Sequence, residues 1–327
     1  MKLVFIGSSK FGLRCLGKVL SLPCCEIAGI ITNRQTFSIS YNQLGVTNIL
    51  HADFSTVAED NKIPCKLMEG KMSDSILIDK VASWSPDLIL VVGWYHMIPK
   101  VIRNIAPTCG IHASLLPDYS GGAPLVWAMI NGEHMTGVTF FMFDDGVDSG
   151  DIIGQKTERI NLNDNIATLY NRIEEKGLLL LEENLPLIAN GTVRLKTQDG
   201  SQRRIMPQRK PEDGLISWET SSLSIYNFIR AQTIPYPGAF TYLNGEKLSI
   251  WEAKFFDYFP TGKRALSIAG EIIAIVDEGP LTGILIATIG GDHPLLITVV
   301  GTVKGELMKA IDYYRKYNIK IGQIFGN

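Results

Sequence analysis

A histidine and an aspartate, separated by a loop-rich segment, are the two side chains of this sequence best suited to work together chemically. His112 ends an apolar run that predicts a strand, and Asp148 lies in an acidic, glycine-rich loop that follows the next strand. A carboxylate that meets an imidazole across a cleft orients the ring and favours its protonated form. Such a pair can move a proton or stabilise a developing negative charge. We therefore expect His112 and Asp148 to be the working pair of a catalytic site.

Two other chemistries have candidate residues in the same segment. Cys109 lies close to His112, and a thiol becomes a nucleophile when a neighbour lowers its pKa, but the sequence shows no neighbour that reaches it. The acidic loop at 144–151 offers oxygen ligands for magnesium, although its spacing differs from that of a calcium loop. We favour proton transfer by the histidine pair and expect no metal; the thiol and the magnesium site stay as alternatives.

The elements that must position this pair are predicted to be alternating strands and helices. Apolar runs predict buried strands at 2–6, 26–32, 63–67, 87–92 and 137–143, and helical periodicity follows the first strand and recurs at 53–61, 73–84, 124–130 and 164–183. This alternation is typical of a Rossmann-like parallel sheet covered on both faces. Ligands of such sheets bind beyond the carboxyl ends of strands. The first turn lacks the spacing G-x-G-x-x-G, so we do not expect a nicotinamide cofactor.

A polar, basic stretch with two prolines, 198–213, is the best candidate for a domain boundary. We place an α/β domain at residues 1–205 and a smaller domain at 206–327. Short predicted strands separated by glycine turns indicate that the smaller domain is β-rich and OB-like. The turns are at Asn244-Gly245 and Gly290-Gly291.

Composition limits the classes of function. The chain has 327 residues, 46% of them hydrophobic, and a net charge of −2, so bulk charge recruits neither nucleic acid nor an anionic membrane. No apolar run resembles a signal peptide or approaches the ~20 residues of a membrane span. The five cysteines are an odd number without metal-finger spacing, as expected of free thiols in a reducing compartment. We expect a cytoplasmic enzyme with a small-molecule partner, and a homodimer.

The segment that begins at His112 resembles the core signature of the folate-dependent formyltransferases. The family pattern is a histidine before Ser-Leu-Leu-Pro, a glycine-rich turn, Pro, an apolar helix, Asn-Gly, Thr-Gly-Val-Thr and an Asp-x-Gly-x-Asp-x-Gly loop. The matching residues are His112, Ser114 to Pro117, Gly121, Pro124, Asn131-Gly132, Thr136 to Thr139, Asp144 or Asp145, Gly146, Asp148 and Gly150. The likeness continues in the N-terminal FIGSSKFG and the closing IKIGQIFG. It implies a Rossmann-like formyltransferase domain followed by a smaller β-rich domain.

The resemblance also implies a reaction. The formyl donor would be 10-formyltetrahydrofolate, an acceptor amine would attack the formyl carbon, His112 would stabilise the oxyanion, and Asp148 would position the imidazole and assist proton transfer. In the family an asparagine two residues before the histidine also donates to the oxyanion, and here that position is Gly110. Loss of such a donor lowers turnover by a factor of about 10²–10³. Three readings stay open: another donor replaces the asparagine, the chain is a catalytically impaired folate and nucleotide-sugar binding protein, or the residue was changed by engineering.

By position, the resemblance implies two sets of contact residues. Core packing is the better expectation for any single aromatic near a strand, and only their place at a strand end favours a functional role for Trp94 and Tyr95. The folate pocket would comprise Gly93, Trp94, Tyr95, Met97, Ile98, Phe143, Asp144, Asp145 and Gly146. The substrate site would comprise Ser8, Ser114, Leu115, Leu116, Pro117, Tyr119, Gly121, Arg230 and Tyr236.

The choice of acceptor amine depends on charge and on the C-terminal half. Arg230-Ala231 and the PYPGAF motif at 235–240 resemble the sugar-nucleotide N-formyltransferases. An enzyme that acts on tRNA should carry a basic stripe or loop, but the segment 33–48 holds only Arg34. We favour an amino-deoxy sugar linked to dTDP or UDP, in lipopolysaccharide O-antigen biosynthesis, with methionyl-tRNA formyltransferase as the alternative. The strongest basic cluster, which also fits a solvated linker, is Arg203, Arg204, Arg209 and Lys210.

Overall fold

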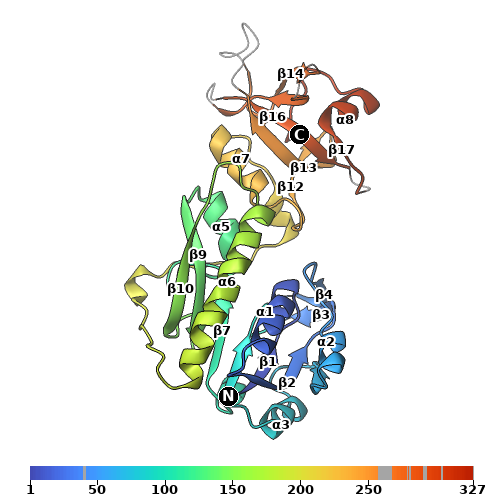
Figure 1. Ribbon diagram of the computed structural model, residues 1–327. Coiled ribbons are helices and arrows are strands. Elements are labelled where there is room, and N and C mark those ends of the chain that lie inside the picture. Colours follow the sequence, from blue (N-terminus) through green and yellow to red (C-terminus); the bar gives the residue numbers. More distant parts are fainter. Residues whose placement is uncertain are drawn as a thin grey trace. The chain divides into compact units, whose positions relative to one another are not determined.

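The chain folds into two compact units (Figure 1). The computed structural model describes residues 1–39, 42–256, 267–277, 279, 281–289, 293–302 and 305–326. The first unit comprises Met1–Pro124, Met135–Arg159 and Asn171–Pro207, and the second comprises Leu125–His134, Ile160–Tyr170 and Gln208–Asn327. The sequence placed a boundary at 205/206; the last division between the units falls after residue 207. Two segments of the N-terminal half belong to the second unit, which the sequence did not indicate.

The first unit is built on a mixed sheet. Among the described residues it has seven strands in the order β10-β9-β7-β6-β1-β2-β5. The five strands from β7 to β5 pair in parallel, as the Rossmann-like prediction requires, whereas β9 is antiparallel to both β7 and β10. The direction of β10 relative to β9 has a simple cause. A parallel crossover needs a connection of about a dozen residues or more, and the loop between β9 and β10 is shorter than that.

The bounds of the elements agree with the predicted strands more closely than with the predicted helices. The helix predicted at 164–183 spans Ile166–Ala189, so it ends six residues later than predicted and contains Pro186. In the first unit the strands are β1 (Lys2–Ile6), β2 (Glu26–Thr32), β3 (Thr36–Ile39), β4 (Asn42–Thr47), β5 (Cys65–Leu67), β6 (Leu88–Val91), β7 (Thr108–His112), β8 (Ser120–Gly121), β9 (Met135–Met142), β10 (Ile152–Arg159) and β11 (Ile205–Met206). The helices of the N-terminal half are α1 (Lys10–Leu20), α2 (Ser55–Asp60), α3 (Ser75–Ser83), α4 (Lys100–Arg103), α5 (Pro124–Ile130) and α6 (Ile166–Ala189).

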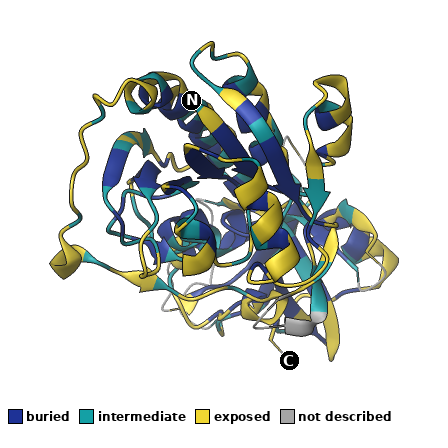
Figure 2. Cartoon of the chain, turned by 90° about the horizontal axis from the view of Figure 1, so that it is seen from below, coloured by how far each residue is buried: buried dark blue, intermediate teal, exposed yellow. Residues whose placement is uncertain are grey.

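The central strands are buried on both faces, which is why they read as continuous apolar runs. Every residue from Leu3 to Ile6 in β1 is fully buried, as are Ile89 and Leu90 in β6. Helix α1 shows the complementary pattern, since its buried residues Cys15, Leu16 and Val19 lie on one side. Figure 2 shows the dark, buried strands between helices whose outer faces are exposed. The sheet is therefore a rigid base for the loops at its strand ends.

The second unit is β-rich, as predicted. Its described strands form an antiparallel sheet in the order β12-β13-β16-β15-β14, and β17 pairs with β16. Asn244 and Gly245 both have positive φ and join β12 to β13, as expected for a two-residue hairpin turn; Gly290-Gly291 lies outside the described residues. The elements of its C-terminal part are α7 (Ser222–Arg230), β12 (Ala239–Leu243), β13 (Glu246–Phe255), β14 (Ile272–Val276), β15 (Gly283–Ile286), β16 (Leu295–Gly301), β17 (Leu307–Lys309) and α8 (Ala310–Lys316). A short 3₁₀ turn at Pro211–Gly214 belongs to this unit, and another at Gly200–Gln202 belongs to the first unit. Among the described helices of the chain, none has the length and apolarity needed to cross a bilayer.

Candidate functional site

The structure brings His112 and Asp148 together. His112 is the last residue of β7, and Asp148 lies in the loop between β9 and β10. His112 Nδ1 is 3.6 Å from Asp148 Oδ2, and the two side chains are 12% and 22% exposed. The same Asp148 oxygen accepts a hydrogen bond of 2.8 Å from the backbone N–H of Gly121. The carboxylate is therefore fixed in front of the imidazole by a neighbouring loop.

The other ring nitrogen of His112 defines which tautomer is present. His112 Nε2 lies 2.8 Å from the carbonyl oxygen of Tyr119. A carbonyl only accepts, so Nε2 must carry the hydrogen. In the neutral ring the lone pair is then on Nδ1, which faces Asp148. The ring can accept a proton at Nδ1, and the resulting cation would lie beside a carboxylate that stabilises it.

The loop that carries Tyr119 is held to the sheet by a buried hydroxyl. Thr139 Oγ1 donates to the carbonyl of Ser114 (2.6 Å) and accepts from the N–H of Leu116 (3.1 Å). Gln155 Nε2 donates to the carbonyl of Leu116 (2.8 Å), and Ser114 Oγ donates to the carbonyl of Asp118 (2.7 Å). Ser114 and Leu116, which the sequence placed in the substrate site, thus shape the loop beside His112.

The remaining residues predicted for this loop also contribute to its shape. Leu115 lies against Gly137, because a Cβ on that glycine would be 2.4 Å from Leu115 Cδ2. The Leu116-Pro117 peptide bond is cis, and Tyr119 and Gly121 both have positive φ. The loop is consequently an irregular turn that delivers one carbonyl to His112 and one N–H to Asp148.

The position that departs from the family pattern has no room for a side chain. A Cβ on Gly110 would be 2.6 Å from the carbonyl oxygen of Val91 and 2.7 Å from Cζ of Phe143. The Phe143 ring packs on Phe141, with centroids 5.0 Å apart, and lies against the core beside β6. Phe143, predicted as a folate contact, therefore fills the space that an asparagine at 110 would need.

The loop after β6 contains the other predicted folate contacts. Gly93 has a φ of +64°, and a Cβ there would lie 1.8 Å from Ser9 Oγ, so only glycine fits. Ser8 Oγ donates to the Gly93 carbonyl (3.3 Å), and Tyr95 OH donates to Asn48 Oδ1 (3.2 Å). Ser8 and Tyr95 therefore tie this loop to neighbouring segments.

Three residues of the same loop differ sharply in exposure. Ile98 is buried, Met97 is 66% exposed, and Trp94 is half-buried. The Trp94 Nε1 atom is buried without a hydrogen-bond partner among the described residues. The exposed thioether and the half-buried indole ring of this loop are apolar surfaces that suit a flat heteroaromatic ring.

Two carboxylates of the acidic loop accept hydrogen bonds from other groups of the protein. Asp145 Oδ1 accepts from Arg103 (2.5 Å) and Oδ2 from Lys100 (3.2 Å), and these cations hold the pKa of Asp145 below its usual value. Asp144 Oδ1 accepts from the N–H of Gly146 (3.0 Å). Among the described residues no group of three or more His, Cys, Asp or Glu side chains is arranged to hold a metal ion.

Cys109 is fully buried in β7, and burial raises the pKa of its thiol well above the usual value. A thiol that is buried and protonated is inert as a nucleophile. The structure therefore gives no support to the alternative of a nucleophilic cysteine.

The second unit contains the two predicted substrate residues of the C-terminal half. Arg230 is 8% exposed and donates from Nε to Asn227 Oδ1 (2.8 Å) and from NH1 to the carbonyls of Asn161 (2.7 Å) and Asp164 (2.8 Å). It lines a cavity of about 510 Å³ in this unit. Tyr236 is half-buried, in the turn before β12.

The basic cluster that the sequence showed is largely engaged in intramolecular contacts. Arg204 forms a bidentate ion pair with Asp118 (2.5 Å for each bond), and its guanidinium stacks over the Tyr119 ring. Arg209 donates to Gln232 Oε1 (2.7 Å) and lies over the Trp127 ring. Arg204 and Arg209 therefore contribute to the packing of the fold, and they are not free to form a basic binding surface.

One residue that contacts the site was missed by sequence reasoning. Gln198 Nε2 donates to the carbonyls of Asp148 (2.9 Å) and Gly150 (2.7 Å). In the sequence Gln198 is only the first residue of a polar stretch interpreted as a linker, and no local pattern distinguishes it.

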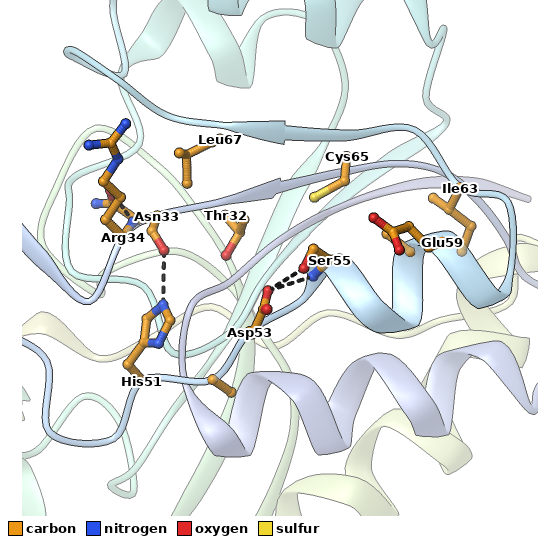
Figure 3. A pocket seen from close by; sticks show the side chains of 12 residues that line it. Thr32, Asn33, Arg34, His51, Asp53, Ser55, Glu59, Ile63, Cys65 and Leu67 are labelled. Atoms are coloured by element: carbon orange, nitrogen blue, oxygen red, sulfur yellow. Dashed lines mark hydrogen bonds between the residues drawn. The ribbon is translucent and has the colours of Figure 1, made fainter.

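A separate cavity of about 570 Å³ lies at the carboxyl ends of β2 and β5 (Figure 3). His51 Nε2 donates to the carbonyl of Asn33 (3.1 Å), and hydrogen bonds from Ser55 hold the pKa of Asp53 below its usual value. Thr32 is 8% exposed, and its hydroxyl has no hydrogen-bond partner among the described residues. Apolar side chains such as Ile63 and Leu67 line the cavity together with the carboxylates of Asp53 and Glu59, and none of the predicted site residues is among its lining residues.

Comparison with known proteins gives two family matches. The model of the formyl transferase family matches residues 27–185, and that of the formyl transferase C-terminal domain matches residues 209–318. A methionyl-tRNA formyltransferase from Clostridioides difficile (strain 630) is 32% identical over 331 residues, which cover 100% of both chains.

Solved structures resemble the fold at lower identity. An N-formyltransferase from Helicobacter canadensis, in complex with folinic acid and dTDP-3-aminofucose, has a TM-score of 0.61 and 19% identity, covering 91% of this chain and 98% of that one. HypX from Aquifex aeolicus in complex with tetrahydrofolic acid has a TM-score of 0.63 and 18% identity, and this chain spans 48% of its length.

Proposed function

Because the chain belongs to the formyl transferase family, a folate-dependent class of enzymes, we propose that it transfers a formyl group from 10-formyltetrahydrofolate to the amine of methionyl-tRNA. The observation that carries the catalytic part is the geometry of one pair. His112 presents Nδ1 to Asp148 Oδ2 at 3.6 Å, while Nε2–H is fixed on a carbonyl. This arrangement suits a group that accepts a proton and then holds a positive charge.

The role of each member of the pair follows from that geometry. The folate donor supplies an electrophilic formyl carbon, and an amine that attacks it must lose a proton. His112 Nδ1 accepts this proton, and Asp148 stabilises the imidazolium without leaving its hydrogen bond to Gly121. The cation in turn stabilises negative charge that develops on the formyl oxygen. When the tetrahedral intermediate collapses, the bond between the formyl carbon and N10 of the folate breaks, and the imidazolium returns the proton to N10, so that tetrahydrofolate leaves. Residue 110 is glycine and offers no side chain to assist, and the Phe143 ring lies where such a side chain would be.

The loop after β6 is the part of this chain that fits the folate donor. Trp94 is half-buried, and Met97 offers an exposed apolar surface nearby in sequence. A pteridine is flat, so its face would cover such apolar surfaces, and its edge atoms would bond backbone groups of the loop. In this proposal Trp94, Met97 and the backbone from Gly93 hold the donor.

The proposal of methionyl-tRNA as acceptor is supported by the curated relatives. The chain is 30% to 36% identical to proteins named methionyl-tRNA formyltransferase, and the match to one of them extends over the full length of both chains.

A nucleotide-linked amino sugar is the second candidate, and the arginines favour it. Arg34 is the only basic residue of the segment 33–48, and it lies 3.9 Å from the carboxylate of Glu69. Arg204 and Arg209 make intramolecular contacts. A chain with so few free cations there is a weak electrostatic partner for a polyanion. This candidate retains the dTDP or UDP sugar, the O-antigen context and the homodimer expected from the sequence.

The two acceptors are separated by a direct assay. The purified chain is incubated with 10-formyltetrahydrofolate and either methionyl-tRNA or a panel of dTDP- and UDP-linked amino sugars, and formylated product is measured by mass spectrometry. Formyl-methionyl-tRNA, formed at a rate that falls steeply with salt, is the expected result. Formylation of a sugar alone would establish the second candidate. Tight folate binding with no product from any acceptor would identify a binding protein, which is the alternative that Gly110 keeps open.

A further inference from the structure

Residues 196–206, here called the strap, run along both loops of the site. At one end Lys196 pairs with Ile152, each accepting from the other's N–H (2.8 and 2.9 Å). At the other end β11 pairs in parallel with β8, so that Ile205 lies opposite Ser120 and Met206 opposite Gly121. The segment that sequence composition marks as a linker is therefore bonded to the strand after Asp148 and to the strand before α5.

Within the strap, Gln198 reaches the loop that carries the aspartate. Its amide nitrogen bonds two carbonyls, those of Asp148 and Gly150. Both partners only accept, so the nitrogen must face them and the amide cannot turn over without losing both bonds. Its Oε1 atom is buried without a partner among the described residues. The side chain is therefore oriented by this one loop.

The Asp148 backbone needs such support. Its φ is +52°, a conformation that L residues other than glycine adopt at a cost of about 1–2 kcal/mol. Gly150 is packed so closely that a Cβ would lie 1.8 Å from the carbonyl oxygen of Met142. Two hydrogen bonds from one amide stabilise this irregular turn on either side of Ser149.

The two ends of the strap converge on the same carboxylate. Gln198 fixes the backbone of Asp148, and β11 fixes Gly121, whose N–H donates to Asp148 Oδ2. We propose that Gln198 is a positioning residue that sets the distance between Asp148 and His112, acting through the Asp148 backbone. This inference rests on the proposed function only in that His112 and Asp148 are taken as the reacting pair.

The test uses a nearly isosteric change. In Gln198→Glu the carboxylate has no hydrogen for the two carbonyls, so the loop is released while volume is conserved. A displacement of about 1 Å at a reacting pair can lower a rate about 10²-fold, and we expect kcat to fall about 10- to 100-fold with KM for the acceptor within about twofold. Gln202→Glu is the matched control, because Gln202 lies in the same strap and, among the described residues, its side chain bonds only the exposed Asp199 (3.2 Å); its kcat should equal that of the wild type.

A double-mutant cycle separates positioning from general loss of structure. If Gln198 acts through Asp148, Gln198→Glu should have little further effect in an Asp148→Asn background. Gln198→Met, which also lacks a donor but adds no charge, is measured in parallel so that the outcome does not depend on one variant folding. An unchanged kcat in both Gln198 variants, or an equal fold-loss with and without Asp148, would overturn the proposal. Absence of product from the wild-type chain with every acceptor would contradict the proposed function instead.

Discussion

The aromatic ring of Phe143 lies where a side chain on residue 110 would have to be, with Cζ 2.7 Å from the position of a Cβ. The neighbouring strand adds a second contact, since the Val91 carbonyl oxygen would be 2.6 Å away. An asparagine side chain at 110 would therefore have to displace the Phe143 ring, which can move, and it would also press on the Val91 carbonyl, which is part of the sheet backbone.

We predict that Gly110→Asn lowers the free energy of unfolding by about 1–3 kcal/mol, the usual range for overpacking a core, and does not raise turnover. Urea unfolding and the formyl-transfer assay measure the two effects. Gly17→Ala is the control, because this glycine lies within α1 and an added Cβ meets nothing within 4 Å; it should stabilise the chain by about 0.5–1 kcal/mol. A stable Gly110→Asn variant with increased turnover would show that the ring yields.

The reacting pair is tested by changes that keep the backbone. Asparagine tolerates positive φ better than most residues other than glycine, so Asp148→Asn removes the charge and leaves the turn in place. We expect Asp148→Asn and His112→Asn each to lower kcat by about 10²–10⁴-fold, the contribution usual for general acid–base catalysis. His134→Asn, at an exposed histidine, serves as the control. Intact turnover in His112→Asn would remove the mechanism proposed here.

Two buried threonines provide a paired test of hydrogen bonding. Thr32 Oγ1 has no partner among the described residues, whereas Thr139 Oγ1 bonds Ser114, Leu116 and Gln155. A buried polar group that loses its partners costs about 1–3 kcal/mol, whereas removing an unpartnered one is neutral or stabilising. Thr139→Val should therefore destabilise the chain in urea unfolding, and Thr32→Val should not. Marked destabilisation by Thr32→Val would reveal a partner, such as a bound water, in the cavity of Figure 3.

The sequence predicts those parts of the fold that depend on local pattern. Strands β1, β2 and β6 are buried on both faces, so their apolar runs are unambiguous. The antiparallel direction of β9 relative to β7 left no comparable signal in the sequence, because the connection between them contains α5 and is long enough for either direction. The assignment of residues 125–134 and 160–170 to the second unit likewise depends on tertiary packing, which no local sequence pattern indicates.

The site divides in the same way. His112 and Asp148 could be paired from the sequence because both follow predicted strands of one sheet. Gln198 could not, since its two bonds join residues 50 and 48 positions apart in the chain. The sequence also could not predict that Phe143 fills the space at Gly110, because this packing depends on how β6, β7 and the loop after β9 lie side by side.

Arg230 was predicted to contact substrate, and its surroundings allow a decision between that role and a structural one. Its guanidinium bonds three acceptors that would be left unpaired and buried in Arg230→Lys, since an ammonium on a linear stem cannot reproduce the fork. We expect this variant to destabilise the chain by about 2–4 kcal/mol. Arg315→Lys is the matched control, because the Arg315 side chain is 57% exposed and, within the part of the chain that the structure describes, forms its ion pair with Asp277 alone; exposed pairs contribute about 0–1 kcal/mol. Urea unfolding gives the stabilities, and KM for the acceptor gives the binding role. Should Arg230→Lys keep its stability and raise KM, Arg230 would be a substrate contact at the cavity it lines; lost stability with KM unchanged would make it a structural residue of the second unit.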